Sequence, residues 1–473
     1  MRALCMLGVA IAALMVGCAT PKVASPPAFA VEGGWSASPV ASATSAPWWR
    51  AWNDTQLEAL IAQALQGSPD AAVLAARVAQ ARASQAATRA AAMPSLNLGT
   101  SAQREGVSRR LRTPGDDGSP GRAERSEFNL DGQLSYELDC LGRNRFTESA
   151  AGAQTQAAEY DAKVARLTLV AVIVETYADL VLAQQELTLA PQRKAVADDT
   201  LFAEQRLLAA GLTTQRAVRE REDAQARAVQ SADEATRRHK QAAHRLALLL
   251  GQPAHRFAAP SVDGAMLQQP LSLEADQPVD VIGRRPDVQA AWQRLLAATA
   301  EGERAALERY PRLSLTGSAG LLADSLSKWL RRDALGWILG LRASVPLFDG
   351  GRVQAQTDQA RATAQERQAE YRRTVLTALQ EVESAVAQWQ FTQRSLEQAA
   401  LTLQRREESE RNARASVAAG RVGRISANDA AASALDARAE LTRARHAHLQ
   451  SHVLLRRALA DPVGVDMQAA TGS

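Results

Sequence analysis

The chain repeats itself over most of its length, and this repeat constrains the fold more than any other feature. Landmarks recur in the same order, first at an offset of about 217 residues and then, after one change in loop length, at about 209: Pro69-Asp70 with Pro286-Asp287, Pro94 with Pro311, 138–143 (LDCLGR) with 347–352 (LFDGGR), 209–211 with 418–420, and Pro253 with Pro462. A period this long is not that of a solenoid. It predicts two large similar units, residues 54–260 and 286–462, joined by a linker (261–285) and followed by a tail (463–473). Such duplications often build pseudo-symmetric membrane channels.

The N-terminal segment reads as an export signal. Residues 1–17 have a basic start and an apolar stretch that is too short to span a bilayer, which is typical of a signal peptide. The sequence LMVGC, ending at Cys18, resembles a bacterial lipobox, in which Cys18 would become the lipid-modified mature N-terminus. Ordinary cleavage with an unmodified Cys18 is the alternative. Residues 18–53, rich in Pro, Ser and Ala, are expected to form a tether.

Two segments are expected to be the longer β-strands, and the clearer one alternates between polar and apolar residues. The clearer one covers 128–138, where Asp131 and Glu137 fall on the polar face, and 336–347 with Arg342 is its counterpart in the second repeat. Shorter strands are expected at 95–100 and 313–318. A half-buried sheet in water would look similar, but a transmembrane barrel strand has this length and pattern. We therefore expect Asp131, Glu137 and Arg342 to face a water-filled lumen.

Four strands cannot close a barrel with a usable interior, and open sheet edges do not occur in lipid. The chain is therefore expected to oligomerise, and three copies would supply twelve strands. The fold class predicted is an α+β membrane protein with internal duplication.

Long helices account for the rest of the chain. Residues 144–210 and 353–419 are each about 67 residues long and end at Ala-Gly, and return helices are expected at 212–250 and 422–459. Shorter helices at 70–93 and 287–310 would stack end to end with the return helices and so match the long ones. Pro191 should kink the first long helix or mark a bulge.

No catalytic or cofactor-binding motif is evident. The chain lacks a phosphate loop, a nucleophile elbow and a metalloprotease motif. His446, His448 and His452 could hold a metal in part, but polar helix surface is the preferred interpretation. The net charge of +4 is small beside the number of charged residues and gives no support for nucleic-acid binding. We expect no enzyme activity, and no cofactor apart from a covalent lipid on Cys18.

Several motifs, in this order and spacing, resemble the outer-membrane efflux protein family, TolC-like and specifically its NodT-type lipoprotein branch: PWWRAWNDTQLEALIAQAL, SYELDCLGRNR, LLLGQP, RRPDVQAAW, YPRLSLTGSAG, VPLFDGGR and ALQEVESAVAQW. The resemblance implies a homotrimer with a twelve-stranded outer-membrane β-barrel continuous with a twelve-helix periplasmic α-barrel. It also implies a periplasmic adaptor and an inner-membrane pump of the RND type as partners. A passive exit duct for small-molecule efflux is the expected function. A type I protein or peptide secretion duct is the alternative, and a lipid-anchored scaffold without a channel is a third.

The same resemblance assigns site residues. The turns at Gly211-Leu212 and Gly420-Arg421 would be the periplasmic tips that dock the adaptor. Ile425 and Asp429, one helical turn apart, would form the apolar and acidic rings of the periplasmic aperture. An Arg common in the family three residues after that Asp is Ala432 here, so any salt bridge that locks the aperture must use another residue, such as Arg424.

Overall fold

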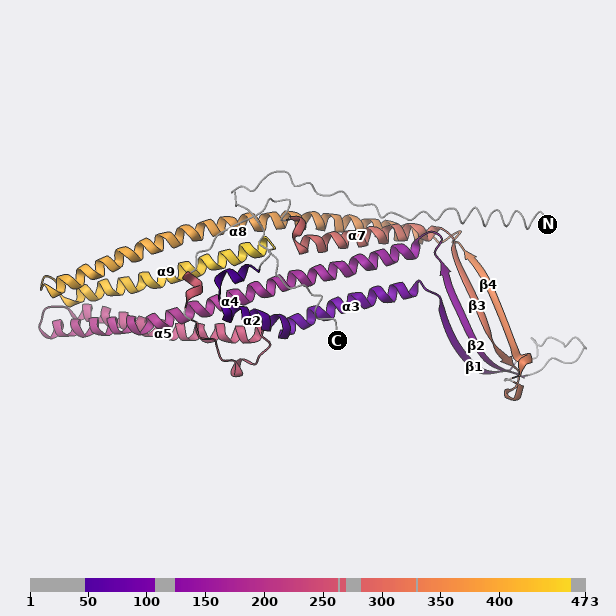
Figure 1. The fold of residues 1–473 in the computed structure, drawn as a ribbon, viewed down its shortest axis with the longest axis horizontal. Coiled ribbons are helices and arrows are strands. Elements are labelled where there is room, and N and C mark those ends of the chain that lie inside the picture. Colours follow the sequence, from indigo (N-terminus) through magenta and orange to yellow (C-terminus); the bar gives the residue numbers. More distant parts are fainter. Residues whose placement is uncertain (1–46, 107–123, 263, 269–281, 329–330, 461–473) are drawn as a thin grey trace, which may run out of the picture. The chain divides into compact units, whose positions relative to one another are not determined.

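A computed structural model describes residues 47–106, 124–262, 264–268, 282–328 and 331–460 (Figure 1). The expected signal peptide, Cys18, most of the tether and the C-terminal tail lie outside the described residues. The chain divides into two compact units. Among the described residues, unit 1 contains those within 79–158 and 291–371, and unit 2 contains those within 47–78, 159–290 and 372–460.

The elements occur in the same order in each repeat. The short 3₁₀ helix η1 (Trp48–Trp52) comes first. The helices and strands of the first repeat follow it: α2 (Thr55–Gly67), α3 (Pro69–Ala91), β1 (Ser95–Gly106), β2 (Glu124–Leu138), α4 (Arg143–Ala209) and α5 (Gln215–Leu249). The second contains α7 (Pro286–Ala306), β3 (Arg312–Ala323), β4 (Leu335–Ser344), α8 (Arg352–Ala418) and α9 (Arg424–Ala458). Helices α4 and α8 are both 67 residues long, and α5 and α9 are both 35 residues long.

The strand boundaries differ from the predicted ones. Strands β1 and β3 are each 12 residues long, about twice the predicted length. The prediction missed their second halves because the residues there do not alternate cleanly, whereas pairing with β2 holds them in the sheet. Strand β4 ends at Ser344 rather than at 347, since Pro346 has no N–H to donate to a ladder. Helix α4 continues through Pro191 without a break in its assignment.

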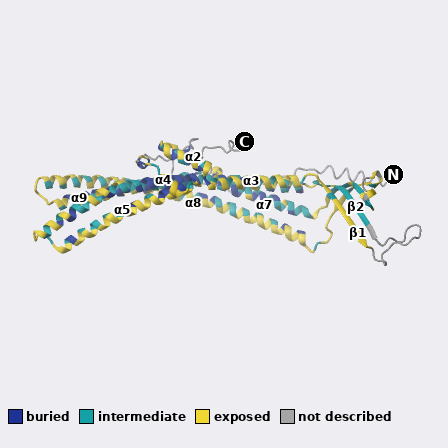
Figure 2. Ribbon diagram, turned by 90° about the horizontal axis from the view of Figure 1, so that it is seen from below, coloured by how far each residue is buried: buried dark blue, intermediate teal, exposed yellow. Residues whose placement is uncertain are grey.

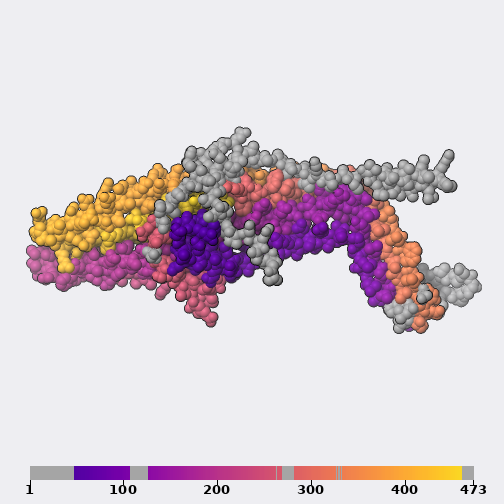
Figure 3. All heavy atoms as spheres, in the orientation of Figure 1, coloured from indigo at the N-terminus to yellow at the C-terminus, as the bar shows by residue number. Residues whose placement is uncertain are grey.

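Unit 1 contains a four-stranded antiparallel sheet in the order β1-β2-β3-β4. Figure 3 shows the strands of the first repeat, in violet, beside those of the second, in orange. In each repeat a threonine ties the long helix to the preceding short helix. Thr155 Oγ1 of α4 donates to the Ala81 carbonyl at 3.2 Å, and Thr357 Oγ1 of α8 donates to the Ala305 carbonyl at 3.3 Å.

Unit 2 contains the main apolar core, which is built around a tryptophan cluster (Trp48, Trp49 and Trp52). These rings meet edge to face and pack, with α2, on a buried face of α4. Figure 2 shows this dark-blue stretch of α4 next to α2. Asp54 caps α2 by accepting hydrogen bonds from the backbone N–H groups of Gln56 and Leu57, both at 3.0 Å. Residues 48–52, the end of the segment expected to be a tether, are therefore part of the packed core.

Both return helices of unit 2 end against the start of a shorter helix, as the length comparison predicted. Gly251, just after α5, lies against the junction of α2 and α3. The approach is so close that a Cβ added to Gly251 would lie 2.8 Å from the Gly67 carbonyl oxygen and 3.0 Å from Pro69 Cδ. At the end of α9, the Ala458 carbonyl accepts a 2.7 Å hydrogen bond from Arg285, the residue before α7.

Arg285 is buried, with a side chain that is 7% exposed. Its guanidinium also bonds Asp287 at 2.7 Å and Glu381 of α8 at 2.6 Å. Burial alone would lower the pKa of Arg285, but the bonds to the two carboxylates raise it above its usual value. The RRPD motif is therefore a charged clasp between α7, α8 and α9.

The three histidines of α9 are buried, so the interpretation as polar helix surface is wrong. His446 lies 2.9 Å from Asp179 of α4, and His448 Nδ1 lies 3.2 Å from Thr392 Oγ1 of α8. His452 meets the rings of the tryptophan cluster. The residue pattern of α9 alone could not predict that these histidines are buried, because the helices that cover them, α4 and α8, are distant in sequence.

Candidate functional site

The sheet in unit 1 exposes one apolar face. The pairing register brings Leu96, Leu134, Gly317 and Leu339 into one row across the four strands. The large apolar side chains that are 60–80% exposed on this face are Leu96, Leu98, Leu335, Trp337, Leu339 and Leu341. Exposed apolar surface of this extent marks an interaction with lipid or with another chain.

The opposite face carries polar groups, and it holds all three residues predicted to face a lumen. Asp131 accepts hydrogen bonds from Asn129 Nδ2 at 2.8 Å and from Gln133 Nε2 at 2.7 Å. Glu137 pairs in register with Ser314, which pairs with Arg342, so these three lie in one row. The Glu137 carboxylate also lies 3.6 Å from Arg143 Nη1 at the start of α4. The structure thus places the predicted residues on one face.

Two sharp turns close the helical hairpins of unit 2. After α4, the Leu212 N–H bonds the Leu207 carbonyl at 2.8 Å while Gly211 has φ of 73°. After α8, the Arg421 N–H bonds the Ser416 carbonyl at 2.9 Å while Gly420 has φ of 69°. Both are Schellman caps, which need a residue in the left-handed region and therefore favour Gly. Leu212 and Arg421 are exposed, as a docking tip requires.

Beyond the second turn, Asp429 is held by an arginine from the first repeat. Arg221 of α5 donates from Nη1 and Nη2 to the two carboxylate oxygens of Asp429, at 2.7 and 3.1 Å. Arg221 Nε also lies 3.8 Å from Glu204 of α4. Ile425, one turn earlier on α9, is half-buried. A two-pronged Arg–carboxylate pair is the strongest geometry for such a bond.

Arg424, the example that the sequence suggested as a partner for the aperture, does not pair with Asp429. Arg424 instead bonds Asp199 of α4 at 2.6 Å, and Asn428 donates to the same carboxylate at 2.9 Å. Arg424 lies one residue before Ile425, so its side chain leaves the helix in a different direction from that of Asp429. Sequence reasoning missed Arg221, which lies on the other return helix, one residue after the position equivalent to Asp429 in the repeat.

The described residues do not hold a metal-binding cluster. Among them, no group of three or more His, Cys, Asp or Glu side chains lies close enough to bind a metal ion. Helix α4 contains a stretch that is long and apolar enough to span a membrane, but 61% of that stretch is buried inside the protein. Its apolar face is therefore accounted for by the core of unit 2.

The sequence profile of the family described as "Outer membrane efflux protein" matches residues 60–252 and 278–461. The chain belongs to the outer membrane efflux protein family. It is accordingly an outer-membrane protein, and its function is efflux. The two matched segments correspond closely to the two repeats.

Relatives agree with this assignment. The chain is 28% identical to the pyoverdine export outer membrane protein OpmQ of Pseudomonas putida, over 97% of each chain. It is 28% identical to the outer membrane protein OprJ of Pseudomonas aeruginosa, over 80% of this chain and 79% of that one.

Solved structures share the fold. The structure is similar to that of a membrane protein from Pseudomonas aeruginosa, with a TM-score of 0.81, 26% identity, and coverage of 93% of this chain and 100% of that chain. It is also similar to the outer-membrane channel OprN, with a TM-score of 0.79, 25% identity, and coverage of 93% and 99%.

Proposed function

We propose that three copies of this chain form one outer-membrane exit duct. The observation that carries the proposal is the four-stranded sheet, whose β1 and β4 edges have no partner strand among the described residues. In lipid, unpaired backbone groups at an edge cost several kcal/mol each, so β1 of one copy pairs with β4 of the next. Three copies then close a twelve-stranded barrel with the apolar rows toward lipid and Asp131, Glu137 and Arg342 toward the lumen.

The long helices extend this conduit into the periplasm. Each copy supplies α4 and α8, and the end-to-end pairs of shorter helices match them in length, so three copies supply a twelve-helix tunnel. The chain acts as a passive conduit and not as an enzyme. The turns at Gly211-Leu212 and Gly420-Arg421 dock a periplasmic adaptor, which joins the duct to an inner-membrane pump of the RND type.

Small-molecule efflux is favoured over protein or peptide secretion. Several relatives carry names that refer to small molecules: pyoverdine export in Pseudomonas putida, toluene efflux in Pseudomonas putida and fusaric acid resistance in Burkholderia cepacia. A deletion strain complemented with this chain should regain export of a dye or drug. Restored secretion of a peptide without restored drug export would reverse the preference.

Ile425 and Asp429 form the aperture at the periplasmic end, and the bond from Arg221 holds it narrow. Asp429→Ala should raise single-channel conductance in a planar bilayer and weaken block by divalent cations. Asp436→Ala is the matched control, because it breaks a comparable 2.8 Å ion pair with Arg193 two turns further along α9. Equal conductance and equal block in wild type and Asp429→Ala would remove the aperture assignment.

Cys18 carries the lipid anchor of the mature chain. Mass spectrometry of the N-terminal peptide should find a triacylated Cys18, and an unmodified cleavage product would exclude the anchor. Cys18→Ser should mislocalise part of the protein while trimers still form, because barrel insertion does not depend on the lipid.

A further inference from the structure

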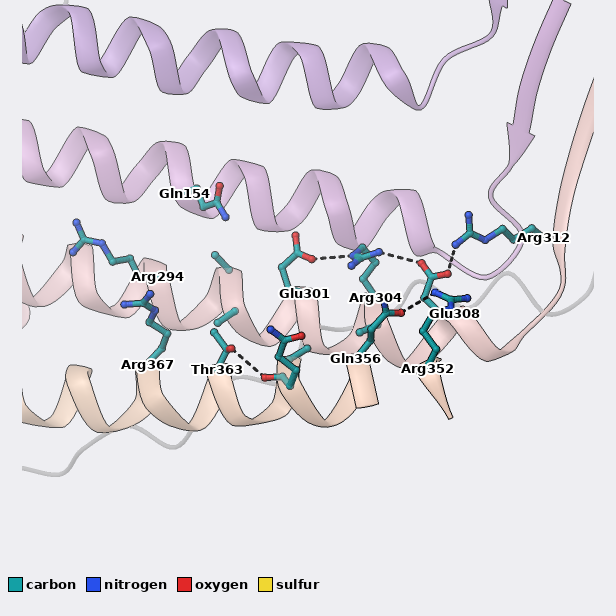
Figure 4. Close-up of a pocket in the computed structure, with 15 residues that line it drawn as sticks. Gln154, Arg294, Glu301, Arg304, Glu308, Arg312, Arg352, Gln356, Thr363 and Arg367 are labelled. Carbon is teal, nitrogen blue, oxygen red and sulfur yellow. Dashed lines mark hydrogen bonds and ion pairs between the residues drawn. The ribbon is translucent and has the colours of Figure 1, made fainter. Parts of the chain in front are cut away.

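A cavity lined with arginine lies in unit 1 near the base of the sheet. It has a volume of about 720 Å³ and is bordered by α7, α8, Gln154 of α4 and the first residue of β3. Figure 4 shows its side chains. Five arginines contribute to its wall, namely Arg294, Arg304, Arg312, Arg352 and Arg367. We call this space the arginine cavity.

Positive charge exceeds negative charge around the arginine cavity. Only two carboxylates, those of Glu301 and Glu308, line it. Arg304 bonds Glu301 at 2.9 Å and Glu308 at 3.1 Å, and Arg312 also bonds Glu308. Glu370, just outside the wall, bonds Arg367 at 2.6 Å. The lining itself therefore contains five arginines and two glutamates, while Glu370 and Asp349, which interacts with Arg352, lie outside it.

The remaining arginines differ in their surroundings. Arg352 Nη1 donates to the neutral amide oxygen of Gln356 at 3.1 Å, and its charge also interacts with that of Asp349, outside the lining. Arg294 of α7 and Arg367 of α8 extend from facing helices toward the same part of the cavity (Figure 4). Two or more guanidinium forks converging on one space form the geometry that binds carboxylate or phosphate groups in a bidentate manner.

The arginine cavity adjoins the polar face of the sheet. Arg312 pairs with Ser344, and Ser314, two residues further along β3, pairs with Arg342. Side chains two residues apart on a strand lie on the same face, so Arg312 belongs to the face that carries Asp131, Glu137 and Arg342. The cavity therefore opens where the polar face meets the helices.

We propose that the arginine cavity binds polyanionic solutes, such as tricarboxylates, on their way through the duct. This rests on the proposed function, in which the polar face lines the lumen. Rings of arginine make a pore selective for anions, and a trimer would place three such cavities around one axis. The substrate class favoured is thus an organic molecule with two or more carboxylate or phosphate groups.

The test uses the full-length protein and citrate as the probe, with two separate readouts. Calorimetry measures citrate binding to the protein in detergent, and a planar bilayer with a KCl gradient measures the reversal potential and citrate block. Wild type should bind citrate and prefer chloride. Arg352→Gln with Arg367→Gln should weaken citrate binding and block at least about tenfold, equivalent to about 1.4 kcal/mol, and should shift the reversal potential toward potassium.

Arg89→Gln is the matched control, because Arg89 is an exposed arginine of the same unit that pairs with Glu148 at 3.7 Å and does not line the cavity. It should behave as wild type, and Arg352→Lys with Arg367→Lys should restore the chloride preference. Citrate binding that is absent in wild type, or equal in wild type and the glutamine variants, would overturn the proposal. Wild-type protein that binds citrate but does not conduct would instead contradict the duct and leave the anion site standing.

Discussion

Helices α4 and α8 occupy equivalent places in the two repeats and have the same length, yet they are covered to different extents. In unit 2, α4 buries a nearly continuous apolar face: Leu169, Val170, Ile173, Val174, Tyr177, Leu180 and Val181. The tryptophan cluster and α2 pack on this face. Helix α8 has a smaller buried set with α9 and leaves Leu376, Phe391 and Leu401 about half exposed.

This difference separates two sources of stability. The surface of α4 is completed by the chain itself, since η1 and α2 supply large apolar side chains in the correct place. The surface of α8 keeps apolar groups in contact with solvent, and such groups are stabilised when another surface covers them. A neighbouring copy in the proposed trimer would provide that surface. Changes at the two helices should therefore affect different measurements.

Replacing a core tryptophan should give the largest effect. Trp52 is 3% exposed and its ring lies 5.5 Å from that of Trp48 and 6.0 Å from that of His452. Trp52→Ala should cost about 3–5 kcal/mol through the lost apolar contact and the cavity left behind. The measurement is thermal unfolding followed by circular dichroism. Phe391→Ala on α8 should hardly change that unfolding but should lower the resistance of the trimer to SDS, and equal effects on unfolding would contradict the comparison.

The two faces of the sheet offer the same contrast in the proposed barrel. Leu134→Arg places a charge in the apolar row and should destabilise insertion by about 2–4 kcal/mol if the residue lies near the bilayer midplane. Ser135→Arg, on the next residue and the opposite face, should be tolerated and should change only conductance. Assembly into outer-membrane vesicles measures both. Equal tolerance at the two positions would show that the faces are assigned wrongly.

Removing the clasp at Arg285 should cost about 2 kcal/mol, because the variant loses hydrogen bonds between charged groups while two partly exposed carboxylates remain. Arg285→Gln is compared with Arg284→Gln, which changes an exposed neighbour outside the clasp. The fall in unfolding temperature should be confined to Arg285→Gln. Similar temperatures for the two variants would mean that the clasp contributes little.

The two turns should respond alike, because here the repeats agree in geometry. Gly211→Ala and Gly420→Ala should each cost about 1 kcal/mol, since both positions require positive φ. Gly302→Ala is the control, because Gly302 lies inside α7 and an added Cβ would meet nothing within 4 Å. The measurement is the unfolding temperature of the three variants. A lower unfolding temperature for only one of the two turn variants would show that the two turns are not equivalent.

His448, one of the three buried histidines of α9, should give the smallest effect. Burial lowers the pKa of His448 below its usual value of 6.5. The unfolded chain therefore binds a proton more readily, so the stability that depends on neutral His448 is present above pH 6.5 and is lost as the pH falls below it. His448→Gln should flatten the decline in unfolding temperature between pH 7 and 5. An unchanged pH profile would show that His448 does not titrate in this range.

Much of the fold follows from sequence because the repeat supplies each element twice. The ends of α4 and α8 could be located from Ala-Gly, and Asp54 could be recognised as a cap from its position before an apolar helix. The C-terminal halves of β1 and β3 could not be predicted, because their residues do not alternate and their strand structure depends on pairing with β2.

The candidate site shows the same limit. Asp131, Glu137 and Arg342 could be assigned to one face because alternation is local. The partners of Asp429 and Arg424 could not be assigned, because Arg221 and Asp199 come from helices about 200 residues away in sequence. The burial of His446, His448 and His452 also depends on such distant contacts.

The central claim is that three chains share one barrel, and native mass spectrometry of the detergent-purified protein tests it most directly. The account predicts a complex of three chains that dissociates only when the detergent or temperature also disrupts the sheet. A stable monomer or dimer that inserts into membranes and conducts ions would contradict it.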